Sequence, residues 1–271
     1  MKDNKLLSEN LEKSWKRYER SVHASRENLS PQNIHQVRVA TQRLEAALSL
    51  AHSLKEMKKA DHITNLLKKV RKGLGPLRDS QVGSNQLENI HGGKKLAESF
   101  KQDQHHAQKK ARTALKNIEL KHDKLNLIKI TKNVCEIESK EKRKDLQKQL
   151  DHKMKSSILK FNLLLGKINP EQMKEIHHFR IFAKKLRYQA ECIQSFNKKL
   201  QFSLKELKNV QSVAGKIQND TVLLNKLNQF LSESKRKDSP RIEKICKSIE
   251  LHREKLIKKD FSQLNSLEWA K

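Results

Sequence analysis

A histidine and an arginine three residues apart, followed at once by valine or isoleucine, occur twice in the chain, at 35–39 and 177–181, each time within a run of helix-forming residues. In an α-helix, residues three or four apart lie on one face, so each copy predicts a stripe of imidazole and cationic side chains. Arginine offers a planar fork for phosphate oxygens, lysine a point charge, and histidine a donor whose charge rises as pH falls. The residue types therefore support binding of a phosphate-rich anion. The two copies contain His35, Arg38, Arg43, His177, Arg180, Lys184, Lys185 and Arg187.

The repeat extends beyond the two stripes. A glycine segment follows each stripe by about forty residues, Leu74-Gly75-Pro76 in the first copy and Ala214-Gly215-Lys216 in the second, and the copies lie about 140 residues apart. This offset predicts an internal duplication within a single domain at 1–271, with a first half at about 1–120 and a second at about 141–271. Enrichment in lysine alone explains one basic stripe as readily as a binding site does. It explains less well a stripe that recurs in register.

The chain carries a large excess of positive charge. Its 271 residues include 59 lysines and arginines against 31 acidic residues, with a formal net charge of +28. Such a charge attracts polyanions, and no segment approaches the roughly 20 apolar residues of a membrane span or the apolar core of a signal peptide. The three cysteines are odd in number and lack Cys-x-x-Cys spacing, which argues against a disulfide framework and a zinc site. We expect a cytoplasmic protein with an anionic partner, no membrane association, no cofactor and no metal; the sequence leaves the oligomeric state open.

Helix signals run along almost the whole chain, so the predicted fold class is all-α. The 7 glycines and 4 prolines leave few turn residues, which favours long helices over many short strands. Ser30-Pro31 and Asn169-Pro170 supply helix starts ahead of the two stripes. We predict helix breaks at 73–75 and at Gly215, one long helix over 94–120, and a charged join between the halves at 121–144.

Taken together, these motifs resemble the CHAD domains, a family whose name denotes a conserved histidine α-helical domain. The resemblance covers nearly the whole chain. It rests on the two His-x-x-Arg helices, the Leu-Gly-x-x-Arg-Asp segment at 74–79, the Lys-Lys-Leu-Arg-Tyr run at 184–188 and the glycine turn at 215. It implies two pseudo-symmetric helical bundles around a basic central pore or groove that binds inorganic polyphosphate without catalysis, and leaves open an association with polyphosphate granules. The ligand-facing positions that it implies are His35, Arg38, Arg43, His177, Arg180, Lys184, Lys185 and Arg187.

Arg78 and Asp79, after the first glycine segment, have different interpretations. Arg78 can reach the pore and joins the candidate polyphosphate ligands, whereas an aspartate in the first turn of a helix favours a structural role, such as orienting Arg78. The chain departs from the family pattern in three places. Gln42 and Glu45 stand where basic residues are common, and Asn219 stands where an aspartate is expected. We therefore expect the first half to bind anions less strongly than the second.

Two other functions stay open. Non-specific binding to nucleic acid follows from the charge, although aromatic residues make up only 4% of the chain and do not alternate with the basic stripe. A polyphosphate or nucleotide hydrolase is the other alternative. The adjacent pairs His105-His106 and His177-His178 point about 100° apart on a helix and chelate one metal poorly. The hydrolase predicts metal dependence and phosphate release, and the nucleic-acid protein predicts a preference for DNA or RNA.

Overall fold

The computed structural model describes residues 6–102, 104–140, 143–194, 200–233, 239–264 and 267. Within these residues the protein consists of helices and contains no strand, which confirms the all-α prediction. None of the described helices has the length and apolar character needed to cross a membrane. The elements are α1 (Leu6–Glu27), α2 (Pro31–Leu54), α3 (Lys58–Glu88), α4 (Lys94–Gln102), α5 (Gln104–Lys116), α6 (Leu120–Lys140), α7 (Arg143–Lys167), α8 (Met173–Ile193), α9 (Leu200–Glu233), α10 (Ser239–Lys255) and a π-helical turn, η1 (Leu256–Phe261).

The two stripe helices begin in different ways. Ser30 caps α2, because its hydroxyl accepts a hydrogen bond from the Asn33 backbone N–H at 3.2 Å and Pro31 follows as the first helical residue. The predicted cap at Asn169-Pro170 is wrong, since α8 begins at Met173. Asn169 instead accepts the Glu171 backbone N–H at 3.0 Å, and this local bond holds a turn ahead of the helix. Helical periodicity also predicts that the apolar side chains of both helices lie opposite the cationic stripes. Most of these side chains are buried, Val37, Ala40, Leu44, Leu48, Phe179 and Leu186, whereas Phe182 is half-buried.

The predicted breaks at 73–75 and at Gly215 are wrong, because α3 and α9 continue through them. Glycine and proline inside a helix cost about 1 and 3 kcal/mol relative to alanine. The residues on either side of each glycine segment are fully buried in the core, and this packing outweighs the local preference to break the helix. They are Leu74 and Leu77 in α3, and Ala214 and Ile217 in α9.

Two other segments differ from or add to the sequence expectation. The single helix predicted over 94–120 is divided into α4 and α5, and residue 103 between them lies outside the described residues. The charged join at 121–144 is largely the helix α6, which buries Leu127, Ile130 and Val134 at helical spacing. The charged residues that led to the prediction of a join lie mostly on the exposed face of this helix.

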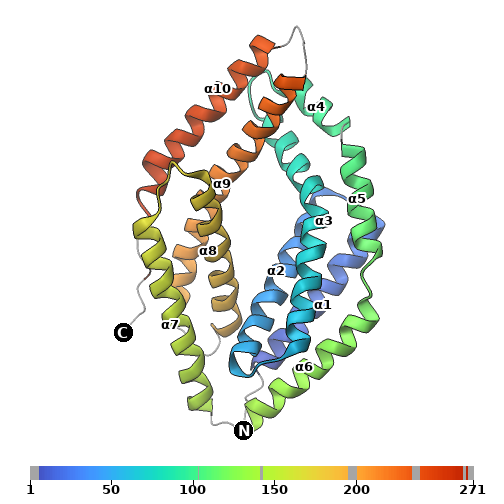
Figure 1. Cartoon of the computed structure of the whole chain (residues 1–271), viewed down its shortest axis with the longest axis vertical. Helices are drawn as coiled ribbons and strands as arrows, with labels where there is room; N and C mark the ends of the chain where they lie inside the picture. The colour runs from blue at the N-terminus through green and yellow to red at the C-terminus, as the bar shows by residue number, and fades with distance from the viewer. Residues whose placement is uncertain are drawn as a thin grey trace.

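The helices form two groups, in which α2 and α3 of one group face α8 and α9 of the other (Figure 1). Helix α2 packs against α8, and α3 packs against α9. One hydrophobic cluster contains residues from α1 to η1, while a second, smaller cluster joins α3 and α4 to α9 and α10. The internal duplication and the division into halves stay predictions. What the packing establishes is that the helices carrying the two repeated motifs face one another.

Candidate anion-binding site

A cleft of about 380 Å³ lies between α2, α3, α8 and α9. It brings together six of the nine candidate ligands, from both repeats: His35, Arg38, Arg78, His177, Arg180 and Lys184. Among the described residues that line it, Asp79 is the sole carboxylate. Three arginines and Lys184 face one carboxylate in a partly buried space. This excess of cations gives the cleft a strong positive potential. A pore through the molecule stays a prediction.

The other three candidates do not line the cleft. Arg43 and Arg187 share the carboxylate of Glu191, with N···O distances of 3.3 and 3.6 Å. Their guanidinium groups also lie over the ring of Tyr188, 5.6 and 4.5 Å from its centroid. Lys185 is exposed. Arg43 and Arg187 are therefore already paired with a protein group, and the side chain of Lys185 is exposed to solvent outside the cleft.

The repeated glycines lie against the repeated arginines. A Cβ placed on Gly75 would be 3.8 Å from Nη1 of Arg38, and one on Gly215 would be 3.5 Å from Nε of Arg180. Arg38 Nη1 also donates to the Arg71 carbonyl oxygen at 2.7 Å, which fixes the guanidinium against α3. At these distances even a methyl group would make only an ordinary van der Waals contact, so each arginine lies directly against the neighbouring helix at its glycine. This contact explains the spacing between motif and glycine better than a turn does.

Arg180 has a buried donor without a partner. Its Nε hydrogen bonds to no acceptor among the described residues. A buried unpaired donor costs about 1–3 kcal/mol, more when it belongs to a charged group. Burial lowers the pKa of Arg180, and the nearby positive charge of Arg38 lowers it further. An anion in the cleft would both accept this hydrogen bond and offset the charge.

The pKa values of Lys184 and His35 are also lowered, by burial and by the neighbouring positive charges. Burial, followed by the charges of Arg180, Arg38 and other arginines, lowers the pKa of Lys184 to about 7. Burial, then Arg78, Lys184 and Arg38, lowers the pKa of His35. Protonation of this histidine therefore requires a pH below its ordinary range. The charge of Lys184 therefore changes near neutral pH.

His177 and Arg78 are held by neighbours on other helices. His177 Nδ1 lies 3.0 Å from the amide oxygen of Gln218 on α9, so this nitrogen carries the proton when the bond forms. Arg78 Nη1 donates to the Pro31 carbonyl oxygen at 3.3 Å and links α3 to the start of α2. Both side chains are thus positioned on the cleft wall before any ligand arrives.

Asp79 acts as a counter-charge to several cations. Its carboxylate raises the pKa of Arg38, Arg78 and Arg180, and so opposes the effect of burial on each of them. One carboxylate near three guanidinium groups cannot neutralise them all. The site keeps its positive excess while its arginines stay charged.

The departures from the family pattern have distinct structural consequences. Glu45 forms an ion pair with Arg71, and so neutralises a cation of the first half. Asn219 lines the cleft, whereas Asp220 is buried away from it, hydrogen bonded to Gln86 at 2.9 Å and to His252 at 2.8 Å. Asp220 therefore links α3, α9 and α10 and does not replace the expected aspartate.

Sequence reasoning missed the glutamines of α9. Gln211 and Gln218 both line the cleft, and the second hydrogen bonds to His177. They lie seven residues apart, on one face of the helix and on either side of Gly215. This i, i+7 spacing around the repeated glycine was the available signal. The described residues contain no group of three side chains able to hold a metal ion.

Comparison with known proteins identifies the fold and the family. The family model of the CHAD domain matches residues 6–228. The chain is also similar to the crystal structure of the CHAD domain from the plant Ricinus communis, with a TM-score of 0.70 and 18% sequence identity over 99% of this chain and 94% of that one. No curated protein sequence matches the chain. Because the family match spans well over half of the sequence, the resemblance of the motifs is confirmed: the chain belongs to the CHAD domain family.

Proposed function

We propose that the cleft binds inorganic polyphosphate and does not cleave it. The observation that carries the proposal is the convergence of Arg38, Arg180 and Lys184 from both repeats on a space with one carboxylate, where the Nε donor of Arg180 is unpaired. Phosphate oxygens accept short, charge-assisted hydrogen bonds from such donors. Binding would also remove repulsion among the cations and release the counterions that screen them.

An extended phosphate chain suits this cleft better than a single phosphate. The cations come from three helices, α2, α3 and α8, so a ligand must present several charges along its length to reach them together. Polyphosphate does so without bases, and the cleft offers few aromatic surfaces for bases to stack on. Among the lining residues that the structure describes, Tyr188 is the one aromatic residue apart from the two histidines. The same features disfavour DNA and RNA as the preferred partner.

The protonation properties of the side chains in the cleft also favour a binding role over catalysis. A general base needs a pKa near the working pH and usually an orienting carboxylate. His35 has a lowered pKa, and its charged neighbours are Arg78, Lys184 and Arg38, all cations. This environment favours holding an anion over activating water beside it.

A competition assay tests the proposal. Fluorescent long-chain polyphosphate would be displaced from the protein by unlabelled polyphosphate, duplex DNA or single-stranded RNA at equal phosphate concentration. We expect polyphosphate to compete best, with no phosphate released in the presence of Mg²⁺ or Mn²⁺. Stronger competition by nucleic acid, or metal-dependent release of phosphate, would overturn the proposal.

A further inference from the structure

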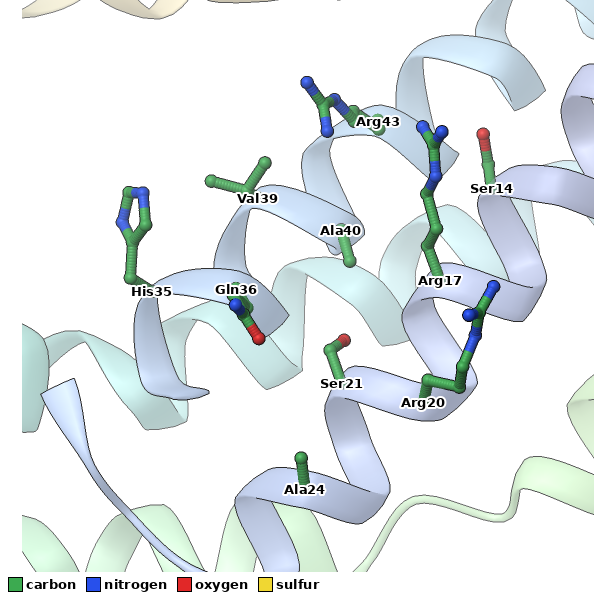
Figure 2. Close-up of a pocket in the computed structure, with 10 residues that line it drawn as sticks. All are labelled: Ser14, Arg17, Arg20, Ser21, Ala24, His35, Gln36, Val39, Ala40 and Arg43. Carbon is green, nitrogen blue, oxygen red and sulfur yellow. The ribbon is translucent and has the colours of Figure 1, made fainter. Parts of the chain in front are cut away.

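A second pocket, of about 670 Å³, lies between α1 and α2 (Figure 2). Three arginines line it, Arg17 and Arg20 from α1 and Arg43 from α2, and no carboxylate does so among the described residues. We call it the α1 arginine pocket. It explains the position of Arg43, which the sequence assigned to the central site and which the structure places here.

The α1 arginine pocket adjoins the central cleft. His35 and Val39 line both spaces. Arg43 provides a further link, because its guanidinium lies over the ring of Tyr188, a residue of the cleft wall. A ligand that occupies the cleft would therefore reach the α1 arginine pocket by passing over the side chains of His35 and Val39.

The face of α1 that lies towards α2 combines small side chains with an arginine. Ser14, Arg17, Ser21 and Ala24 recur at spacings of three and four and share this face. The small side chains form the floor of the pocket where α1 packs against α2, and Ser21 donates its hydroxyl proton to the Tyr18 carbonyl oxygen at 2.8 Å. The arginines stand above this floor. In Figure 2 the side chains of Arg17 and Arg20 extend from α1, and that of Arg43 extends from the neighbouring helix α2.

The two arginines of α1 are available to a ligand. Both are exposed, and neither forms an ion pair with a carboxylate in the part of the chain that the structure describes. Arg20 uses Nε to donate to the Lys16 carbonyl oxygen at 3.2 Å, which leaves its terminal nitrogens free of that bond. Like charges one turn apart repel, so their proximity is favoured only when solvent or an anion screens them.

We propose that the α1 arginine pocket is a second polyphosphate subsite, which continues the central cleft and binds the part of a long chain that extends beyond it. The inference rests on the proposed function and adds selection for chain length. A short polyphosphate fills the cleft alone. A long one also reaches Arg17 and Arg20 and gains affinity from each, while Arg43, which is paired with Glu191, lies between them and the cleft.

The double variant Arg17→Ala/Arg20→Ala tests this subsite with two probes, tripolyphosphate and long-chain polyphosphate. Affinity for the long chain should fall about fivefold to tenfold, since two exposed charge contacts are lost. Affinity for tripolyphosphate should change less than about twofold, within the effect expected of remote charges. The slope of log affinity against log salt should decrease by about two for the long chain only. The double variant Arg17→Lys/Arg20→Lys, which keeps the charge, should retain most of the long-chain affinity.

Arg112→Ala/Lys116→Ala is the matched control, because it removes two exposed cations from α5, outside both spaces. It should leave the preference for long chains intact. The subsite is overturned if this control weakens long-chain binding as much as the α1 variant does, or if the α1 variant weakens both probes equally. Failure of the proposed function looks different, because the wild-type protein would then bind neither probe. Circular dichroism confirms that each variant is folded.

Discussion

Arg180 and Arg38 occupy corresponding places in the two repeats but have different partners. Arg38 donates to the Arg71 carbonyl oxygen, whereas Nε of Arg180 is buried without an acceptor. We therefore expect Arg180→Ala to weaken polyphosphate binding by about tenfold to a hundredfold, as for loss of a charge-assisted hydrogen bond. Arg38→Ala should weaken binding less and should lower the free energy of unfolding, because it leaves a carbonyl without its donor. Titration calorimetry and urea unfolding of both variants measure the difference. Equal losses of affinity would contradict the assigned roles.

The lowered pKa of Lys184, about 7, predicts uptake of a proton on binding. A bound anion favours the charged amine and raises this pKa towards its ordinary value, so at about pH 8 the complex holds a proton that the free protein lacks. Affinity should decrease as pH rises above about 7. Calorimetry in buffers of different ionisation enthalpy measures the uptake, and Lys184→Met should abolish it. Binding at about pH 8 without proton uptake would contradict the prediction.

The same shift affects the stability of the free protein in the opposite pH direction. Between the folded pKa of about 7 and the higher value of an unfolded lysine, the unfolded chain holds the proton that the folded cleft releases. This contribution therefore makes the folded state more stable as pH rises through that range. The cleft carries an electrostatic cost that the ligand removes, which is common where a fold maintains a binding site.

At the scale of helices, the sequence predicted which side chains share a helix face better than it predicted where helices begin and end or which helices contact one another. Helical periodicity placed Arg180 and Lys184 on one stripe and Phe179 and Leu186 on another, because side-chain direction follows from the 3.6-residue turn alone. The i, i+4 spacing of Arg187 and Glu191 was also present in the sequence as a sign of an ion pair. The contact of Arg43 with Glu191 crosses from α2 to α8 and depends on tertiary packing. Periodicity in one helix could not predict it.

Glycine was the residue most easily misinterpreted, and two positions provide a test. A Cβ on Gly215 would meet Arg180 Nε at 3.5 Å, an ordinary contact, whereas one on Gly73 would lie 2.3 Å from Cβ of Ala114 on α5. We expect Gly215→Ala to raise the free energy of unfolding by up to about 1 kcal/mol, through the higher helix propensity of alanine. Gly73→Ala should lower it by about 1–3 kcal/mol, because α3 and α5 must move apart. Urea unfolding compares the pair. A loss of stability in Gly215→Ala would contradict this expectation and show that Arg180 needs the space that the glycine leaves.

At the scale of the molecule, the cleft depends on contact between the two groups of helices. Arg38 and Arg78 come from one group, and Arg180 and Lys184 from the other (Figure 1). The buried carboxylate of Asp220 bonds to Gln86 of α3 and His252 of α10, and so fastens the groups beside the site. The cations repel one another across the interface while this network and the hydrophobic clusters hold it closed. An anion between the groups would add to their attraction.

This balance predicts opposite effects of salt on the free and bound protein. With a net charge of +28, the free protein should melt at a higher temperature as salt increases, because screening at a Debye length of about 10 Å in 0.1 M salt weakens the repulsion. The bound protein gains stability in proportion to the logarithm of ligand concentration over Kd, and Kd rises steeply with salt. The two melting temperatures should therefore converge as NaCl is raised at fixed polyphosphate. Calorimetry across a salt series measures both, and the double variant Arg180→Met/Lys184→Met should show a smaller gap at low salt. If both temperatures rose in parallel, binding would not depend on the charge of the cleft.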